Sequence, residues 1–304
     1  MVGEYCRRDR NTTRLFAVAE LDKRPKVLVV GWDGVRDDTL RQMAPEAISE
    51  IASRGRWWTT TLPDVDIAPT MTAVGWSTIL TGVWPDRHEV LGNDDTYHLL
   101  HRYPDMLTRA FCARPDIATY AATSALIFGT DFGPGPVLGP GVRTMTWFDR
   151  RTYPGGFADT DVLVADDAER RLGTQEHDFS FVYLGETDSA AHAHGVGSRY
   201  EEAIARQDAR LARMVQAIRA RPTFDDESWL VMLTTDHGHR DEGGHGRGSW
   251  QERQSFVVAG LLDGSPATWA TEAANVDIAP TAWAHLRVTP SERWLCQGTS
   301  LLAP

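Results

Sequence analysis

Cysteine is scarce in this chain: 304 residues contain three, Cys6, Cys112 and Cys296, and none belongs to a Cys-x-x-Cys pair. A sparse, odd set is not a disulfide framework and indicates reduced thiols. The basic residues near the start, within Met1 to Arg10, are not followed by the apolar run of a signal peptide. From these two features we expect a cytoplasmic protein.

Long hydrophobic runs and excess positive charge are also lacking. No segment approaches the roughly 20 apolar residues that span a bilayer. The 31 basic and 42 acidic residues give a net charge of −11, which argues against binding nucleic-acid polymers or anionic membranes. A phosphate-containing small molecule is not excluded, because bound metal ions can reverse the local field. We therefore expect a small-molecule substrate and no membrane partner, while the sequence leaves the oligomeric state open.

Short apolar runs rich in β-branched residues alternate with segments of helical periodicity, and 42% of the residues are hydrophobic. This alternation predicts an α/β fold: a doubly wound, mostly parallel sheet with helices on both faces. Strands are expected at 26–32, 117–122, 179–184, 229–234 and 255–259, and helices at 44–54, 73–80, 199–219 and 280–285.

No linker divides the chain into two domains. Residues 1–24 are polar and without periodicity, which predicts an irregular N-terminal arm, and 25–304 then form a single domain. The stretch 129–160 is rich in Gly, Pro and aromatic residues and is too long for a simple connection. We expect it to belong to a small lid inserted at about 93–160.

Polar clusters follow several predicted strands. Asp33 ends the first, Asp188 and His192 come after the strand at 179–184, and Asp236-His237 and then His245 follow the strand at 229–234. Parallel strands end at one edge of a sheet, so these side chains can converge. A lone Asp is more often a helix cap, and a lone His more often lies at the surface. Three Asp and three His at successive strand ends instead suggest two divalent metal ions, with Zn²⁺ the best match and Mn²⁺ or Fe tolerated.

A two-metal site of this kind needs a nucleophile. The segment 68–82 carries several hydroxyls at the start of a predicted helix, among them Thr70 and Thr72. A helix N-terminus stabilises negative charge such as an alkoxide or a phosphate. Without further evidence, threonine here is equally explained as an N-cap.

Taken in order, these motifs resemble the alkaline phosphatase superfamily, most closely its nucleotide pyrophosphatase/phosphodiesterase branch, with phosphonoacetate hydrolases next. Thr72 stands ten residues before Gly82, as the nucleophile does in that branch. The matching segments are Asp33-Gly34-x-Arg36, Pro69-Thr70-x-Thr72, Thr81-Gly82-x-x-Pro85-x-x-His88, Asp188-x₃-His192, Asp236-His237-Gly238 and Gly244-His245-Gly246. The resemblance covers roughly residues 26–286 and implies a single catalytic domain of alkaline phosphatase type.

The resemblance also implies a role for each residue. Thr72 would be the nucleophile and would share a metal ion with Asp33, Asp236 and His237. A second ion would be held by Asp188, His192 and His245, and would serve hydrolysis of a phospho-threonine intermediate. Asn93 would donate to a non-bridging phosphate oxygen. The implied activity is hydrolysis of a phosphodiester or a nucleotide pyrophosphate.

Departures from the family pattern leave the substrate open. Val74-Gly75-Trp76 replaces a common Pro-Asn-His and, with Glu89, is expected to alter the pocket wall. A phosphomonoesterase and a phosphonate C–P hydrolase therefore remain alternatives, as does a non-catalytic metal-binding protein. The cysteine that type I sulfatases convert to formylglycine is absent around Thr72, which argues against that class.

Other residues could complete the site. His194 and His239 lie beside the implied ligands; either is a supporting residue, an exposed one or a replacement ligand, with His239 the stronger candidate for the last. Arg36 and Arg247 are the nearest basic residues that could grip a monoester dianion, although a salt bridge explains Arg36 better. The side chains proposed to line the pocket, with core packing as their alternative, are Trp76, Trp84 and Trp147.

Overall fold

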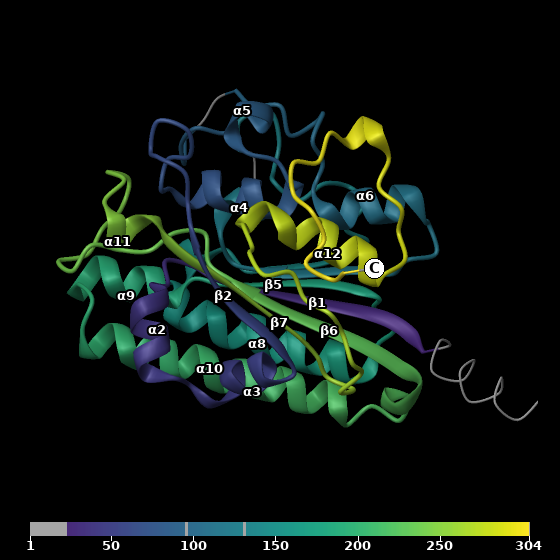
Figure 1. Cartoon of the computed structure of the whole chain (residues 1–304). Coiled ribbons are helices and arrows are strands. Elements are labelled where there is room, and N and C mark those ends of the chain that lie inside the picture. The colour runs from purple at the N-terminus through teal and green to yellow at the C-terminus, as the bar shows by residue number, and fades with distance from the viewer. Residues whose placement is uncertain (1–22, 95–96, 130–131, 304) are drawn as a thin grey trace, which may run out of the picture.

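The computed structural model describes residues 23–94, 97–129 and 132–303. The expected arm therefore lies outside the described residues up to position 22, as does Cys6. Arg24 already belongs to the first strand. A seven-stranded sheet, in the order β2-β7-β6-β1-β5-β3-β4, crosses the molecule (Figure 1). Its strands are β1 (Arg24–Trp32), β2 (Gly55–Thr61), β3 (Thr119–Thr123), β4 (Thr144–Trp147), β5 (Phe179–Leu184), β6 (Glu227–Thr234) and β7 (Gln254–Leu261).

The sheet is mostly parallel, as the sequence predicts. β1 pairs in parallel with β5 and β6, and β3 pairs in parallel with β5 and β4. β7 is antiparallel to both β2 and β6, so within the described chain it alone runs against the other strands. The carboxyl ends of the remaining strands consequently meet at one edge, which is where ligands bind in open α/β sheets.

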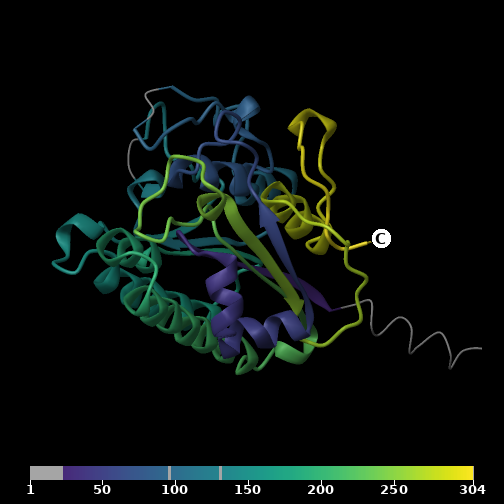
Figure 2. The same cartoon turned by 60° about the vertical axis from the view of Figure 1, so that its left-hand side comes forward.

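Helices cover both faces of the sheet, which confirms the doubly wound arrangement. In Figures 1 and 2, α4, α6 and α12 lie on one side of the sheet, and α2, α3, α8 and α10 lie on the other. The α-helices are α2 (Asp37–Met43), α3 (Glu46–Ser53), α4 (Thr72–Thr81), α5 (Pro85–His88), α6 (Met106–Ala113), α7 (Leu126–Gly129), α8 (Phe157–Thr174), α9 (Glu186–His194), α10 (Ser198–Arg219), α11 (Trp250–Arg253) and α12 (Ile278–His285). No helix in the described part of the chain has both the length and the apolar character needed to cross a bilayer.

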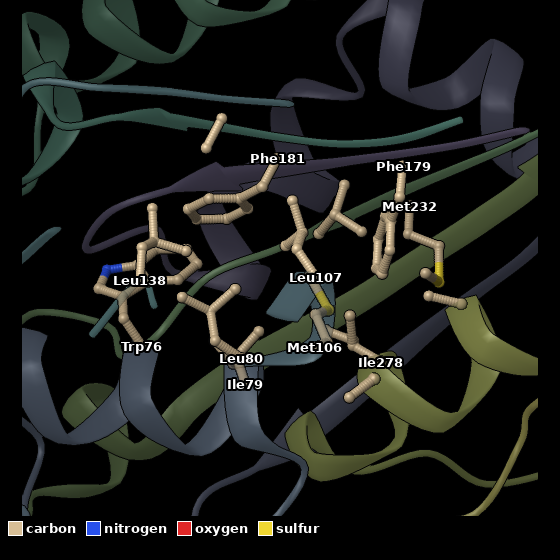
Figure 3. Close-up of a cluster of buried hydrophobic side chains, with 14 of the residues drawn as sticks. Trp76, Ile79, Leu80, Met106, Leu107, Leu138, Phe179, Phe181, Met232 and Ile278 are labelled. Atoms are coloured by element: carbon tan, nitrogen blue, oxygen red, sulfur yellow. The ribbon is translucent and has the colours of Figure 1, made fainter. Parts of the chain in front are cut away.

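Two hydrophobic clusters, one on each face, hold the sheet between the helices. Val27 and Val29 of β1 pack in one cluster, while Leu28 and Val30 pack in the other. Successive strand residues point to opposite faces, so a strand buried on both sides must be apolar throughout. Figure 3 shows the first cluster, where Phe181 of β5 lies near Trp76 of α4. Each such side chain contributes about 1.5–3 kcal/mol when fully buried.

Several elements were not predicted: the strands β2 and β4 and the helices α2, α6 and α8. The polar segment after β5, which contains Asp188 and His192, was given no secondary structure and is the helix α9. Within the stretch 129–160, residues 144–147 form β4 at the sheet edge, and α8 begins at Phe157. Whether any of 93–160 moves as a lid stays a prediction.

Candidate active site

The polar residues singled out from the sequence lie at the carboxyl edge of the sheet. Asp33 follows β1, Asp236 and His237 follow β6, and α9, which carries Asp188, follows β5. Figure 1 shows α9 and α11 at the same end of the sheet. His245 lies in the loop that leads from β6 to α11. The parallel topology thus brings together residues up to about 200 positions apart.

Asp33, Asp236 and His237 form the deep half of this cluster, and all three are fully buried. One donor atom from each lies within 4.8 Å of the other two. His237 Nε2 is 3.3 Å from Asp236 Oδ2 and 3.8 Å from Asp33 Oδ1. None of these three atoms has a hydrogen-bond partner among the described residues. Buried polar atoms are nearly always paired, so three that converge without a partner fit a metal cation.

The other polar atoms of these three side chains are held by the protein. Asp33 Oδ2 accepts hydrogen bonds from the Tyr183 hydroxyl at 2.6 Å and from the Trp76 indole N–H at 3.0 Å. Asp236 Oδ1 accepts from the Gly34 backbone N–H at 3.1 Å. His237 Nδ1 lies 3.1 Å from the Gly238 carbonyl, to which it can donate, leaving the Nε2 lone pair free. Such partners orient ligands in metal sites.

Burial shifts the pKa values of these three side chains. It raises the pKa of Asp33 well above its usual range, and the nearby charge of Asp188 adds to the effect. Burial and the charge of Asp33 raise the pKa of Asp236 in the same way. Burial lowers the pKa of His237 well below 6.5. A divalent cation would favour ionised carboxylates and a neutral imidazole, which is the state that ligation needs.

The outer half of the cluster is built around Asp188. Its Oδ1 atom lies 2.9 Å from His239 Nε2, 3.5 Å from His192 Nε2 and 3.6 Å from His245 Nε2. His245 Nδ1 is 2.7 Å from the Thr70 carbonyl, so its Nε2 is left to face Asp188. Although burial opposes it, the hydrogen bond and charge of His239, with His245 and His192, lower the pKa of Asp188.

The histidines that gather around Asp188 are not the expected set. His239 is fully buried and, with His237 and His245, belongs to a second group of donor atoms around Asp188 that all lie within 4.8 Å of one another. His192 is outside this group, although it touches its edge, with its ring centroid 4.9 Å from that of His245. His194 is exposed at the end of α9. The sequence signal for His239 was its place two residues after His237 in a strand-end loop.

Thr72 is the first residue of α4, so its side chain sits at the positive end of that helix. Asn93 is fixed beside it, because its Oδ1 accepts a hydrogen bond of 2.9 Å from the Ala73 N–H. The helix also passes directly over Asp236: a Cβ added to Gly75 would lie 2.6 Å from Asp236 Cβ. Glycine is therefore required at this close approach.

Two expectations about the pocket wall are wrong. Gly75 and Trp76 do not line the pocket: Gly75 faces Asp236, and the buried Trp76 orients Asp33. Trp147 donates to the Ala125 carbonyl, and neither it nor Trp84 lines the cavity that holds Thr72. The indole rings of Trp76 and Trp147 instead donate hydrogen bonds to neighbouring groups.

The cavity beside Thr72 has a volume of about 550 Å³. Asn93, Asp188, His192 and His245 line it, so it brings together residues from both the nucleophile helix and the outer half of the cluster. Its other walls are formed by Asp94, Ala125, Leu126, Ile127, Arg150, Phe157, Tyr183, Ser189 and Ala193.

The basic residues near this cavity differ from those expected. Arg36 forms ion pairs with Asp38 and Asp241, which confirms the salt-bridge interpretation. Arg247 is exposed and does not line the cavity. Arg150 does line it, and no sequence feature indicated this residue.

Comparison with known proteins agrees with this arrangement. A family model described as type I phosphodiesterase / nucleotide pyrophosphatase matches residues 27–110 and 115–254. Human ectonucleotide pyrophosphatase / phosphodiesterase 5 is similar in structure, with a TM-score of 0.65 and 14% identity over 92% of this chain and 100% of that one. Curated proteins include no match.

Two other solved structures share the fold. The phosphonate monoester hydrolase of Agrobacterium radiobacter has a TM-score of 0.57 and 16% identity over 91% of this chain and 76% of that one. A 2-O GAG sulfatase has a TM-score of 0.63 and 13% identity over 92% of this chain and 73% of that one. At such identities these structures establish only the fold, but the family model spans most of the chain. The chain therefore belongs to the type I phosphodiesterase / nucleotide pyrophosphatase family, within the alkaline phosphatase superfamily.

Proposed function

We propose that this protein is a metal-dependent hydrolase of phosphorus esters that acts on a phosphodiester or a nucleotide pyrophosphate through phospho-Thr72. One observation carries the proposal. Three buried donor atoms of Asp33, Asp236 and His237 converge without hydrogen-bond partners in the described part of the chain, next to a cavity lined by Thr72 and Asp188. Membership of the type I phosphodiesterase / nucleotide pyrophosphatase family supports the same proposed activity.

The donor set fits two divalent ions. Asp33, Asp236 and His237, with Thr72, would hold one, and Asp188, His192 and His245 would hold the other. His239 would orient Asp188. Carboxylate and imidazole ligands suit Zn²⁺ and tolerate Mn²⁺ or Fe. Bound there, the ions would stabilise the negative charge that develops on the nucleophile and on the transferring phosphoryl group.

The chain's own groups prepare the nucleophile and the phosphoryl group. The N-terminus of α4 favours negative charge on Thr72 Oγ1. Since Asn93 Oδ1 already accepts from Ala73, its Nδ2 group is left to donate to a non-bridging oxygen. The apolar wall of Ala125 and Ile127 offers a surface for an organic leaving group.

The reaction would consist of two in-line displacements. In the first, a bond forms between Thr72 Oγ1 and phosphorus, the bond to the leaving oxygen breaks, Thr72 gives its proton to solvent, and the leaving oxygen takes one up. In the second, water attacks phosphorus and gives a proton to solvent, the phosphorus–Oγ1 bond breaks and Thr72 regains a proton. Two inversions give net retention at phosphorus.

A phosphomonoesterase using the same residues is the second candidate. It is favoured by a single observation, the guanidinium of Arg150 in the cavity wall, since a monoester carries one more negative charge than a diester. A phosphonate substrate would use the same groups, and nothing in the cavity distinguishes it.

The test compares bis-p-nitrophenyl phosphate with p-nitrophenyl phosphate, using Zn²⁺-loaded protein and an EDTA-treated control. We expect turnover that chelation abolishes, and a loss of about 1,000-fold or more in Thr72→Ala, as for other nucleophile deletions. Thr72→Ser keeps the hydroxyl and serves as the matched control. Metal content is measured for both variants, so that a lost ion is not mistaken for a lost nucleophile. Full activity in Thr72→Ala would rule out the phospho-threonine route.

A further inference from the structure

Arg150 is the one lysine or arginine among the described residues that line the Thr72 cavity. It lies in a short 3-10 turn, η1 (Arg150–Thr152), three residues beyond the end of β4. β4 is parallel to β3, so this turn comes to the same edge of the sheet as the candidate metal ligands. Its place in the site thus follows from the topology of an edge strand.

The Arg150 side chain packs against an aromatic ring, that of Phe157. Its guanidinium carbon is 4.7 Å from the centroid of the Phe157 ring. Phe157 is itself buried, with its centroid 5.9 Å from that of Tyr183, whose hydroxyl donates to Asp33. A guanidinium stacked on an aromatic face keeps its N–H groups free at the edges. Arg150 is therefore anchored to the same framework that orients Asp33.

Arg150 forms no ion pair within the described residues, and its charge is one of several causes, after the hydrogen bond from Arg151, that lower the pKa of Asp149. Asp149 is engaged by Arg151, whose Nε and Nη2 atoms lie 2.9 and 2.7 Å from its two carboxylate oxygens. Asp94 lines the same cavity, but no ion pair joins it to Arg150, and no other carboxylate of the described chain pairs with Arg150. Most other arginines near the sheet, such as Arg36 and Arg221, do have carboxylate partners.

A half-buried, unpaired guanidinium that faces a candidate phosphoryl site is suited to bind an anion, because arginine presents several donors in a geometry that matches phosphate oxygens. The candidate ions and Asn93 already account for the single charge of a diester. We propose that Arg150 is a specificity-determining residue which selects phosphorus esters that carry a second negative charge. This inference rests on the proposed function and narrows its substrate class.

The second charge could lie on the transferred phosphoryl group itself, as in a monoester, or on an adjacent phosphate, as in a nucleotide with a pyrophosphate linkage. Three substrates separate these sources: bis-p-nitrophenyl phosphate with one charge, p-nitrophenyl phosphate with two on the same phosphorus, and ATP with further charges on neighbouring phosphates. Each is assayed with the metal-loaded protein and with Arg150→Met, Arg150→Lys and Arg143→Met.

We expect Arg150→Met to lower the ratio of kcat/KM for a multiply charged substrate to that for bis-p-nitrophenyl phosphate by about 10- to 100-fold, the range for losing charge-assisted hydrogen bonds. A fall for p-nitrophenyl phosphate assigns the charge to the transferred group, and a fall for ATP alone assigns it to the neighbouring phosphate. Arg150→Lys should recover part of the ratio. Arg143→Met, which removes an exposed arginine that stacks on Phe111 away from the cavity, should leave the ratio at the wild-type value.

A binding measurement keeps the inference testable if turnover is not observed. Titration of inorganic phosphate into the metal-loaded protein, followed by calorimetry, should show weaker binding by Arg150→Met than by Arg143→Met. Equal losses on all three substrates, or equal phosphate binding by the two variants, would overturn the role of Arg150. Failure of the wild type to hydrolyse any of the esters, with phosphate binding still dependent on Arg150, would instead count against the proposed function.

Discussion

The two halves of the candidate metal centre differ in how their carboxylates are balanced. In the deep half, Asp33 and Asp236 face one neutral imidazole, and three donor atoms have no hydrogen-bond partner in the described chain. In the outer half, Asp188 is surrounded by three imidazoles within 3.6 Å of its Oδ1 atom. The pKa of each deep carboxyl is raised by burial, whereas that of Asp188 is lowered by its histidines.

This difference indicates how strongly each half depends on a bound metal ion. The carboxylate of the outer half already has a hydrogen-bond partner, since His239 Nε2 lies 2.9 Å from Asp188 Oδ1, so it depends less on an added ion. The deep half cannot, because two buried carboxylates close together cannot both ionise at low cost without a cation. We therefore infer that the deep half has the higher affinity for metal and that its charges destabilise the metal-free protein.

The largest expected effect comes from changing the deep half, in Asp236→Asn. Asparagine still accepts the Gly34 N–H hydrogen bond but binds metal poorly and carries no charge. The loaded enzyme should lose one ion and about 1,000-fold or more in activity, since even outer-shell partners are worth 10–100-fold. The metal-free protein should become more stable, by on the order of 1–2 kcal/mol or a few degrees in Tm, because a desolvated charge is removed.

Metal content, rates and thermal unfolding with and without EDTA measure these opposite effects on one variant. The stabilisation should grow as pH rises from the usual carboxyl pKa of 3.8 toward the raised pKa of Asp236, because the unfolded wild type then ionises before the folded one, and it should level off above that pKa. If metal-free Asp236→Asn is less stable than metal-free wild type at every pH, the comparison of the two halves is wrong.

The same contrast explains how much of the molecule the sequence could predict. β1, β5 and β6 are apolar runs buried on both faces, and α10 has a clear apolar stripe, so their periodicity sufficed. α9 was missed because its sequence between Glu186 and His194 lacks an apolar stripe and is held by other means. Asp161 accepts from the Gly185 and Glu186 N–H groups and so caps its first turn.

For the site, the sequence predicted the ligand types and their positions at strand ends, but it did not predict the residues that orient those ligands. Trp76 looked like a pocket wall, yet its role depends on Gly31, where an added Cβ would lie 2.3 Å from the indole ring. Arg150 enters the cavity because β4 joins the sheet beside β3. The first fact depends on which helix packs on β1 and the second on which strands are neighbours, and a single sequence carries little information about either.

A smaller effect on metal binding is expected when a residue that orients Asp33 is changed and all the candidate ligands are kept. Tyr183→Phe deletes the 2.6 Å hydrogen bond to Asp33 Oδ2 but leaves the bond from Trp76. We expect a loss of about 10-fold in metal affinity, at the low end for an outer-shell partner. Tyr120→Phe is the matched control, because Tyr120 is also buried and donates to a carboxylate, Asp167, away from the site. Equal affinities for the two variants would mean that Tyr183 does not orient Asp33.

The smallest effect should come from the outer half, in His239→Gln. His239 Nε2 lies at hydrogen-bond distance from Asp188 Oδ1, 2.9 Å, and Gly34 leaves the space for its ring. If His239 orients Asp188, a glutamine amide can replace the donor, and the protein should keep both ions with a few-fold weaker outer site. If His239 is itself a ligand, the variant should lose one ion. Elemental analysis gives the zinc stoichiometry, with the exposed His194→Gln as the control. Two bound ions would mean that His239 orients Asp188 through the protein alone, whereas one would mean that the outer half, like the deep half, depends on an ion to balance its carboxylate.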